Sequence, residues 1–374
     1  LHRVDRRQRQ MCIRDRINYT GLTPGTVTDP MKGGVINPIS VYPFPNFKAE
    51  QTKSYELGTN LRLFNNKINI DATVYLTDTY NQTFLSSMSP ASGYSGFYVQ
   101  AGKVRNKGIE LSLGYNDRFG KVGYATNLTY TANRNKIMKM VHDYKNPSDG
   151  SLFSITELTL QDKGGVYLRE KDAIGDVYVK GILARGKDGK LIEEEGGYKV
   201  DRSQRIKIGS VNPDFSIGWR HNVTWNNITL DLLFNGRFGG IVTSSTQAFL
   251  DDYGVSKDTY KARQNGGVWV NGTQYDAEKY YTTIGGEQLM AYYAYKATNI
   301  RLQEASLSYT LPGKWFGNVI NRLTVSAIGR NLWMIYNKAP FDPEMTSSTG
   351  TYNRGDVFMP PSLRSVGFSV KIEL

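Results

Sequence analysis

The sequence predicts an all-β protein whose long antiparallel strands cross a membrane as part of a β-barrel, and three observations lead to that prediction. Apolar residues alternate with polar or small ones over segments longer than the usual strand of a soluble sheet. The connections between these segments alternate between short and long. The composition is polar, with a mean hydropathy of −0.45, and no run of about 18 apolar residues is available for a membrane-spanning helix.

The alternation is clearest at the end of the chain, in "RSVGFSVKIEL". There every second residue from Val366 to Leu374 is apolar, so these side chains share one face of a strand. A strand that crosses a membrane needs roughly 9–11 residues, and each segment found in this way is at least that long. The same test predicts nine strands, near 51–64, 67–83, 105–117, 121–133, 213–226, 228–241, 298–311, 321–335 and 362–374.

The connections favour a barrel over the alternative, a soluble antiparallel sandwich with decorated loops. Tight turns such as Asn-Asn-Lys and Asn-Asn alternate with long segments at 134–212, 242–297 and 336–361. Outer-membrane barrels have short periplasmic turns and long extracellular loops, which predicts a periplasmic C-terminus. Single-chain bacterial barrels have even strand numbers, so nine strands and the missing signal peptide predict an incomplete barrel.

The first sixteen residues, "LHRVDRRQRQMCIRDR", differ from everything that follows. They hold the only cysteine and six arginines against two aspartates, a third of the net charge of +12. We interpret 1–16 as a non-native, adapter-derived segment, with a genuine disordered loop as the alternative. Residues 17–45 are expected to be the remnant of an extracellular loop and 46–374 the barrel. The remaining charge forms no basic stripe, so no nucleic-acid partner is expected.

Four stretches carry a family resemblance: "VRNKGIELSLGY" (104–115), "IGSVNPDFSIGWRHNVTWNNITLDLLFNGRFGG" (208–240), "ATNIRLQEASLSYTLP" followed by "LTVSAIGRNLWMIYNKAPFDPE" (297–344), and the terminal "PPSLRSVGFSVKIEL". In this order they resemble the C-terminal barrel of SusC/RagA-type TonB-dependent outer-membrane receptors. The resemblance implies about nine of the 22 strands of a plugged barrel. It also implies that TonB acts through an N-terminal plug outside this sequence, that a SusD-like surface lipoprotein closes the extracellular mouth, and that oligosaccharides or peptides are imported.

The resemblance assigns two further roles. Barrel-assembly machinery would read the terminal strand through Phe368, Val370, Ile372 and Leu374; alternatively, these residues only face outer-membrane lipid. Phe341-Asp342-Pro343-Glu344 resembles the family's loop-entry signature, for which we expect a shaping role rather than ligand contact.

The segment 242–297 is rich in aromatic residues, which suit stacking on a glycan or peptide substrate or anchoring of a partner. We expect Tyr253, Tyr260, Trp269 and Tyr275 to make such contacts. Three tyrosines beside the next strand, Tyr292, Tyr293 and Tyr295, are expected instead to join an aromatic girdle at the membrane surface.

The sequence gives no sign of an enzyme or of a cofactor. It has three histidines and no nucleophile-elbow, P-loop or zinc-protease motif. The run Glu193-Glu194-Glu195 lacks the alternating oxygen ligands of a calcium loop, so no metal is expected. The alternative to an importer is an outer-membrane barrel that serves as an adhesin or structural anchor without transport.

Overall fold

A computed structural model describes residues 41–42, 48–87, 96–145, 150, 152–160, 166–316, 319–347 and 355–373. The proposed non-native segment 1–16, most of 17–45 and the terminal Leu374 lie outside these ranges. The chain divides into two compact units. The first comprises 1–56, 75–107 and 134–174, and the second 57–74, 108–133 and 175–374.

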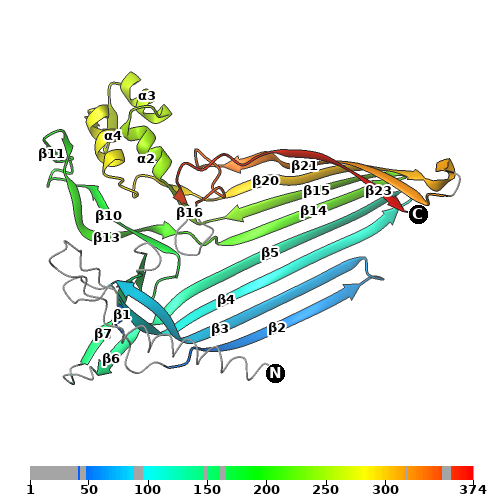
Figure 1. The fold of residues 1–374 in the computed structure, drawn as a ribbon, viewed down its shortest axis with the longest axis horizontal. Coiled ribbons are helices and arrows are strands. Elements are labelled where there is room, and N and C mark those ends of the chain that lie inside the picture. Colours follow the sequence, from blue (N-terminus) through cyan, green and yellow to red (C-terminus); the bar gives the residue numbers. More distant parts are fainter. Residues whose placement is uncertain are drawn as a thin grey trace, which may run out of the picture. The chain divides into compact units, whose positions relative to one another are not determined.

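One large sheet contains all nine predicted strands, which confirms the all-β antiparallel prediction (Figure 1). Its order follows the chain, and β2 and β23 are the two ends of that order among the described strands. A tenth strand, β1 (Val41–Tyr42), pairs in parallel with β4 and was not predicted. The nine strands are β2 (Gln51–Leu63), β3 (Ile68–Ser87), β4 (Gly96–Phe119), β5 (Val122–Lys139), β14 (Phe215–Trp225), β15 (Ile228–Phe238), β20 (Asn299–Pro312), β21 (Arg322–Asn337) and β23 (Ser365–Glu373).

In the second unit, the register places apolar residues beside apolar residues and polar residues beside polar residues on neighbouring strands. Val325 on β21 pairs with Tyr309 on β20 and with Val370 on β23. The next residue, Ser326, pairs with two more serines, one on each side. Because side chains alternate between the faces of a strand, this register gives the sheet one apolar and one polar face.

The short turns use residues that tolerate a left-handed backbone. Asn65 and Asn66 have φ of 55° and 65° in the β2–β3 turn, and Asn226 has φ of 50° between β14 and β15. Asparagine adopts this conformation more readily than most residues, which explains these turn sequences. In the second unit the turn after β14 lies at one end of the strands and the helices at the other (Figure 1).

The first unit contains strand segments that alternation did not predict. β3, β4 and β5 have 20, 24 and 18 residues, more than expected, because they continue toward the long connections. In these extensions buried residues stop alternating, since the neighbours Val99 and Gln100 are both buried. The unit also holds the short antiparallel pairs β6 (Val141–Lys145) with β7 (Leu152–Ile155) and β8 (Glu157–Thr159) with β9 (Tyr167–Arg169).

The second unit carries regular structure where long loops were expected. We call residues 176–210, 241–296 and 355–358 the loop module. Side chains of Ser244, Ser256 and Asp276 cap its three helices by accepting hydrogen bonds from backbone N–H groups, as N-cap residues do. Its elements are β10 (Asp176–Leu183), β11 (Glu193–Glu194), β12 (Gly197–Tyr198), β13 (Val200–Ser210), β16 (Ile241–Ser244), α2 (Ser245–Asp252), α3 (Lys257–Gln264), β17 (Val268–Val270), β18 (Thr273–Tyr275), α4 (Ala277–Gly286), β19 (Ala294–Lys296) and β22 (Gly355–Asp356).

One further helical turn, η3 (Gly313–Phe316), lies between β20 and β21. Among the described residues, no helix has both the length and the apolar character needed to span a membrane.

Candidate functional site

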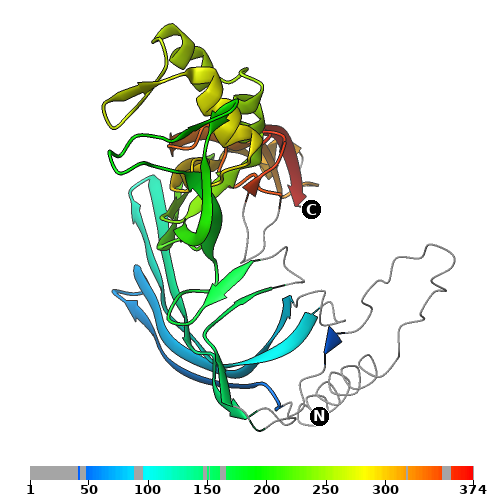
Figure 2. The same ribbon diagram turned by 90° about the vertical axis from the view of Figure 1, so that its left-hand side faces the viewer.

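The loop module has a hydrophobic core of its own, built from two connections that are distant in the sequence. Side chains from the β10–β13 region pack against side chains from the helical segment, and the two lie side by side in Figure 2. The cluster consists of Leu183, Leu191, Tyr198, Ala248, Tyr275, Ile284, Leu289 and Tyr293. Long connections thus become one packed body that can hold surface residues in fixed positions.

Tyr275 belongs to this core rather than to the surface. Only 7% of Tyr275 is exposed, and its hydroxyl accepts a hydrogen bond from the Leu191 N–H at 3.0 Å. Its ring meets the Tyr198 ring edge-on, with centroids 5.6 Å apart. The expectation of a contact residue at this position does not fit such burial, because both the ring and its polar tip are already engaged in packing.

The three tyrosines assigned to a membrane girdle also help to build the loop module. Tyr293 is buried in the core, and the Tyr292 hydroxyl accepts a hydrogen bond from the Leu183 N–H at 3.0 Å. The Tyr295 ring stands edge-on to the Phe341 ring at 5.6 Å. Their position beside β20 suggested the girdle, but packing against β10 and its neighbours occupies them instead.

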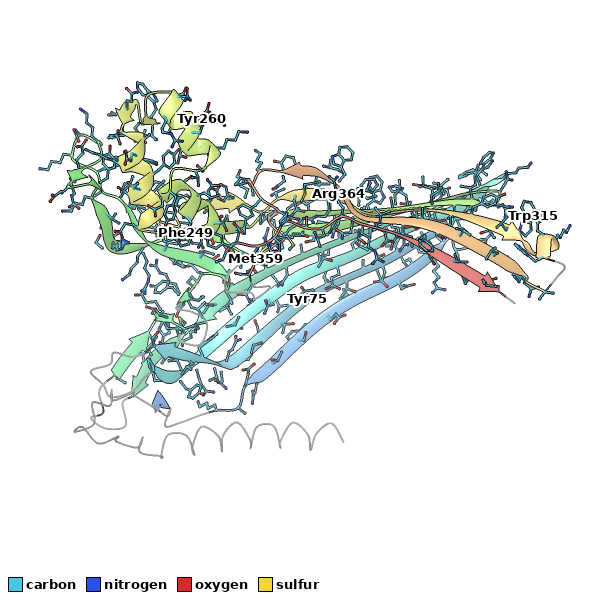
Figure 3. All side chains as sticks on the ribbon, turned by 45° about the horizontal axis from the view of Figure 1, so that its top comes forward. Tyr75, Phe249, Tyr260, Trp315, Met359 and Arg364 are labelled. Atoms are coloured by element: carbon cyan, nitrogen blue, oxygen red, sulfur yellow. The ribbon has the colours of Figure 1, made fainter. Side chains whose placement is uncertain are left out.

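The other three candidate contact residues are exposed. Tyr253 follows α2, Tyr260 lies on α3 at the end of the module away from the sheet, and Trp269 lies on the β17–β18 hairpin (Figure 3). Their exposed fractions are 76%, 58% and 62%. Rings displayed in this way can stack on a ligand or anchor a partner.

A buried carboxylate lies on α2, two residues before Tyr253. Asp251 on α2 is buried, and its Oδ1 accepts a hydrogen bond from Gln247 Nε2 at 2.9 Å. Burial raises the pKa of Asp251, although hydrogen bonding to Ser256 and Gln247 opposes that rise. Burial also raises the pKa of Tyr281 to about 12. No sequence pattern pointed to Asp251 as a buried residue, because an aspartate in a short helix usually faces solvent.

Two clefts open on the loop module. One, of about 240 Å³, is lined by Tyr253, Arg263 and Tyr281 together with the acidic residues Asp251, Asp252 and Glu278. The other, of about 420 Å³, is lined by Glu194, Tyr198 and their neighbours. The first cleft combines an exposed aromatic ring, a cation and carboxylates, groups that can orient a polar organic ligand.

The polar face of the sheet carries paired charges and paired hydroxyls. Arg220 Nε lies 2.9 and 3.0 Å from the two carboxylate oxygens of Asp231, and Arg330 Nε lies 2.8 Å from Glu304. Closer to the short turns, the Ser308 and Ser326 hydroxyls are 2.8 Å apart. A face of this kind suits the water-filled interior of a barrel.

Arg301 joins the sheet to the loop-entry segment after β21. This arginine is buried, and its Nη2 lies 2.8 Å from Asp342 and 3.3 Å from Glu344. Burial alone would raise the pKa of the Asp342 carboxyl, but the bond from Arg301 and further hydrogen bonds hold it below its ordinary value. Both carboxylates of the loop-entry segment are engaged with Arg301, which supports a shaping role.

The terminal strand presents its apolar side chains outward. Phe368 is 84% exposed, and Val370 and Ile372 are also exposed. Leu374, the fourth residue of the predicted assembly signal, lies outside the described residues.

Neither a metal centre nor a catalytic arrangement emerges from the described side chains. None of their His, Cys, Asp and Glu groups cluster in a way that could hold a metal ion. His221 lies in an apolar row of β14, where its Nδ1 is 2.9 Å from the Tyr124 hydroxyl.

Comparison with known proteins defines the class. The family described as "TonB dependent receptor-like, beta-barrel" matches residues 16–176. TonB-dependent receptors P3 and P39 of Formosa agariphila are 24% and 21% identical to this chain, over 85% and 83% of it. The chain spans about a third of the length of these curated relatives, 33% and 34%.

Solved structures show the same fold. The RagAB peptide transporter superimposes with a TM-score of 0.64 at 18% identity, over 89% of this chain and 36% of the other. The "open-open" state of the RagAB peptide importer gives 0.65 at 19% identity, over 90% and 36%.

The sheet, its register and these matches define a transmembrane β-barrel of the outer-membrane type. Residues 16–176 match the β-barrel of TonB-dependent receptors, and most of the chain is similar in sequence to such receptors.

Proposed function

We propose that this chain forms part of the wall and the external loops of a TonB-dependent importer in the outer membrane of a Gram-negative bacterium. The observation that carries the proposal is the difference between the two faces of the sheet. One face is apolar, and the opposite face carries paired hydroxyls and paired charges. An apolar outer face suits lipid, and a polar inner face suits passage of hydrophilic solutes. In this arrangement the short turns and the C-terminus lie in the periplasm.

The proposed cargo is a peptide or an oligosaccharide, taken up together with a SusD-like surface lipoprotein. Two solved structures similar to this chain are of the RagAB peptide transporter, which favours peptides. Tyr253, Tyr260 and Trp269 are proposed to contact the substrate or the partner, since all three are exposed on the loop module.

The remaining roles follow from the same proposal. TonB would act through a plug outside residues 46–374, and the barrel-assembly machinery would read Phe368, Val370, Ile372 and Leu374. No catalysis is proposed, because the relatives are receptors. Residues 1–16 remain a proposed non-native segment. The match to the family begins only at residue 16, the last residue of this segment.

Uptake by a deletion strain tests the function. Cells lacking the receptor gene should fail to accumulate labelled peptides of one composition, and the gene on a plasmid should restore uptake. Loss of oligosaccharide uptake instead would identify the other cargo class. Unchanged uptake of both together with lost surface adhesion would overturn the importer and support an adhesin or anchor.

Cysteine labelling tests the orientation. A membrane-impermeant maleimide should label Trp269→Cys in intact cells but should reach Trp315→Cys, near the η3 turn, only after the outer membrane is broken. Trp269 and Trp315 are both exposed, so accessibility within the fold does not separate them. The opposite labelling pattern would invert the proposed topology.

A further inference from the structure

The apolar face of β4 becomes basic toward the long connections. Lys103, Arg105 and Lys107 are alternate residues of this strand, so their side chains share one face. The next residue of the same face, Ile109, is apolar and exposed. Val104 lies on the opposite face and is buried. Three cations therefore follow directly on the apolar residues of this strand.

The neighbouring strands add further cations to this face. The strands β2, β3, β4 and β5 are consecutive in the sheet (Figure 1). On β2, the exposed Lys53 continues the row of Tyr55 and of exposed leucines. On β5, the exposed Arg134 and Lys136 continue the row of Tyr130. All these cations belong to the first unit, and together they form what we call the basic patch: Lys53, Lys103, Arg105, Lys107, Arg134 and Lys136.

One carboxylate and one aromatic ring organise the centre of the basic patch. Asp78 on β3 is buried, and Arg105 donates to both of its oxygens, from Nε at 2.7 Å and from Nη2 at 2.8 Å. Lys103 Nζ lies 2.7 Å from the same carboxylate. The ammonium groups of Lys53 and Lys103 lie 5.7 and 5.2 Å from the centroid of the Tyr80 ring. Three cations thus share one carboxylate and one ring, so the positive charge is held in place and exceeds the negative charge.

The spacing along β4 sets the height of these cations in a membrane. Lys107 lies twelve residues from Phe119, the last residue of β4 before the short turn. At about 3.4 Å per residue and a tilt of about 40°, this interval rises roughly 30 Å. The apolar band of an outer-membrane barrel is about 25 Å tall, with aromatic residues at both of its edges. The exposed Tyr55, directly before Lys53 in the row of β2, fits such an edge. The basic patch therefore lies at the level of the lipid headgroups on the side of the long connections.

We propose that the basic patch is a binding site for the phosphate groups of glycolipids in the outer leaflet of the outer membrane. The proposal rests on the outer-membrane location and the orientation given under the proposed function. Clusters of lysine and arginine beside a membrane-spanning segment recognise anionic lipid headgroups, and arginine matches phosphate oxygens with paired donors. In a closed barrel this face meets lipid, because further strands of the wall join at the edges of the sheet. A bound phosphate would neutralise the positive charge that Asp78 leaves in excess.

Native mass spectrometry of the intact purified receptor with added lipid A tests the site. Lys53→Gln/Lys107→Gln removes two exposed cations and leaves both ion pairs of Asp78 in place, and it should bind lipid A about tenfold more weakly or less. Lys53→Arg/Lys107→Arg keeps the charge and should bind like the original. Lys121→Gln/Lys314→Gln removes two exposed cations near the short turns and should also bind like the original.

Two further arms identify the ligand. Lipid A stripped of its phosphates should bind the original receptor as weakly as intact lipid A binds Lys53→Gln/Lys107→Gln. Equal binding of the two lipids by the original receptor would show that the acyl chains hold the lipid, which overturns the proposal. Displacement of intact lipid A by an equimolar amount of inorganic phosphate would assign the site to the free anion and would also overturn it.

The outcomes separate this site from the proposed function. If Lys53→Gln/Lys107→Gln binds as much lipid A as the original receptor, the site is wrong, while uptake that depends on the receptor would still support the importer. If the deletion strain takes up peptides and oligosaccharides normally, the importer is wrong, while weaker binding of lipid A by the variant would still support the site. If Lys121→Gln/Lys314→Gln loses lipid A equally, the binding follows net charge alone and the proposal fails.

Discussion

The sheet and the loop module use the same residue types in opposite ways. On the outer face of β23, Val366 and Phe368 are more than four-fifths exposed, as expected for side chains whose solvent is lipid. In the loop module, Tyr275 and Tyr293 are buried, with exposed fractions of 7% and 2%. The comparison teaches that aromatic enrichment alone does not locate a contact surface. The period in which the residues recur, and what covers them, decides whether they face outward or inward.

The two regions also differ in what stabilises them. The sheet rests on long, nearly uninterrupted ladders, such as the eleven residue pairs between β14 and β15. The loop module rests on a cluster of eight buried side chains and a few helix caps. Arg301 joins the sheet to the loop-entry segment, because it lies on β20 while its partners Asp342 and Glu344 lie in the connection after β21.

Removing the ion pair between Arg301 and Asp342 is expected to have the largest effect on stability. Arg301→Ala leaves Asp342 buried without its counter-ion, which typically costs about 3–5 kcal/mol. The opening free energy of segments 338–347 and 355–364, measured by native-state hydrogen exchange, should fall by this amount. The ladders between β14 and β15 should keep their protection.

A matched pair gives the control for that prediction. Arg330 makes an equally short bond, 2.8 Å, to Glu304, but it is largely exposed. Arg330→Ala should therefore cost less than about 1 kcal/mol. Adding Asp342→Asn to an Arg301→Met chain should recover part of the loss, since the buried charge of Asp342 is then removed as well. Equal losses of stability in Arg301→Ala and Arg330→Ala would show that burial does not determine how much each ion pair contributes.

The hydrophobic core of the loop module is expected to stabilise the module independently of the barrel strands. Leu289 is fully buried, and a Cβ added to Gly181 would lie 2.8 Å from its Cδ2, so the segment just after α4 packs closely against β10. Leu289→Ala should cost about 2–5 kcal/mol through lost contacts and a cavity. Limited proteolysis should then cut within 245–296 while the barrel strands stay intact. Leu307→Ala, on the exposed side of β20, should leave the module resistant, and cleavage of both variants alike would contradict an independent core.

The sheet could be predicted from sequence because its signal is local. Alternation at period two survives wherever one face meets lipid and the other a polar interior, as from Val366 to Ile372. The prediction lost accuracy where that contrast ends, so β4 extends to Gly96 rather than 105. The helices of the loop module are 8–10 residues long, too short for a clear period of 3.6.

The candidate site could be predicted only in part, for a related reason. Exposed Tyr253, Tyr260 and Trp269 and buried Tyr275 look alike in sequence, because what buries Tyr275 comes from Leu191 and Tyr198, about eighty residues earlier. N-cap signals were present at Ser244, Ser256 and Asp276 and could have revealed the helices. The pairing of Arg301 with Asp342 depends on long-range packing that no local pattern records.

The smallest expected effect concerns pH and the inward-facing Asp251. Because burial raises its folded-state pKa above the ordinary value of 3.8, folding favours the protonated carboxyl. The stabilisation is complete below that ordinary value and is lost as the pH rises through the raised pKa. The loop module should therefore lose about 1.4 kcal/mol for each unit of pKa difference as the pH rises from 4 toward 8.

Asp251→Asn removes the titration while an amide oxygen can still accept the hydrogen bond from Gln247. Hydrogen exchange of the module between pH 4 and 8, corrected for intrinsic exchange rates, should show stability falling with pH in the original chain and nearly constant stability in the variant. Asp252→Asn, at the next position on α2, is the control and should keep the original slope. A falling slope that survives Asp251→Asn would assign the pH dependence to other groups. In that case the hydrogen bonds of the Asp251 carboxylate would offset the cost of its burial. The inward-facing charge and the outward-facing aromatic residues on α2 would then not reduce the stability of the loop module.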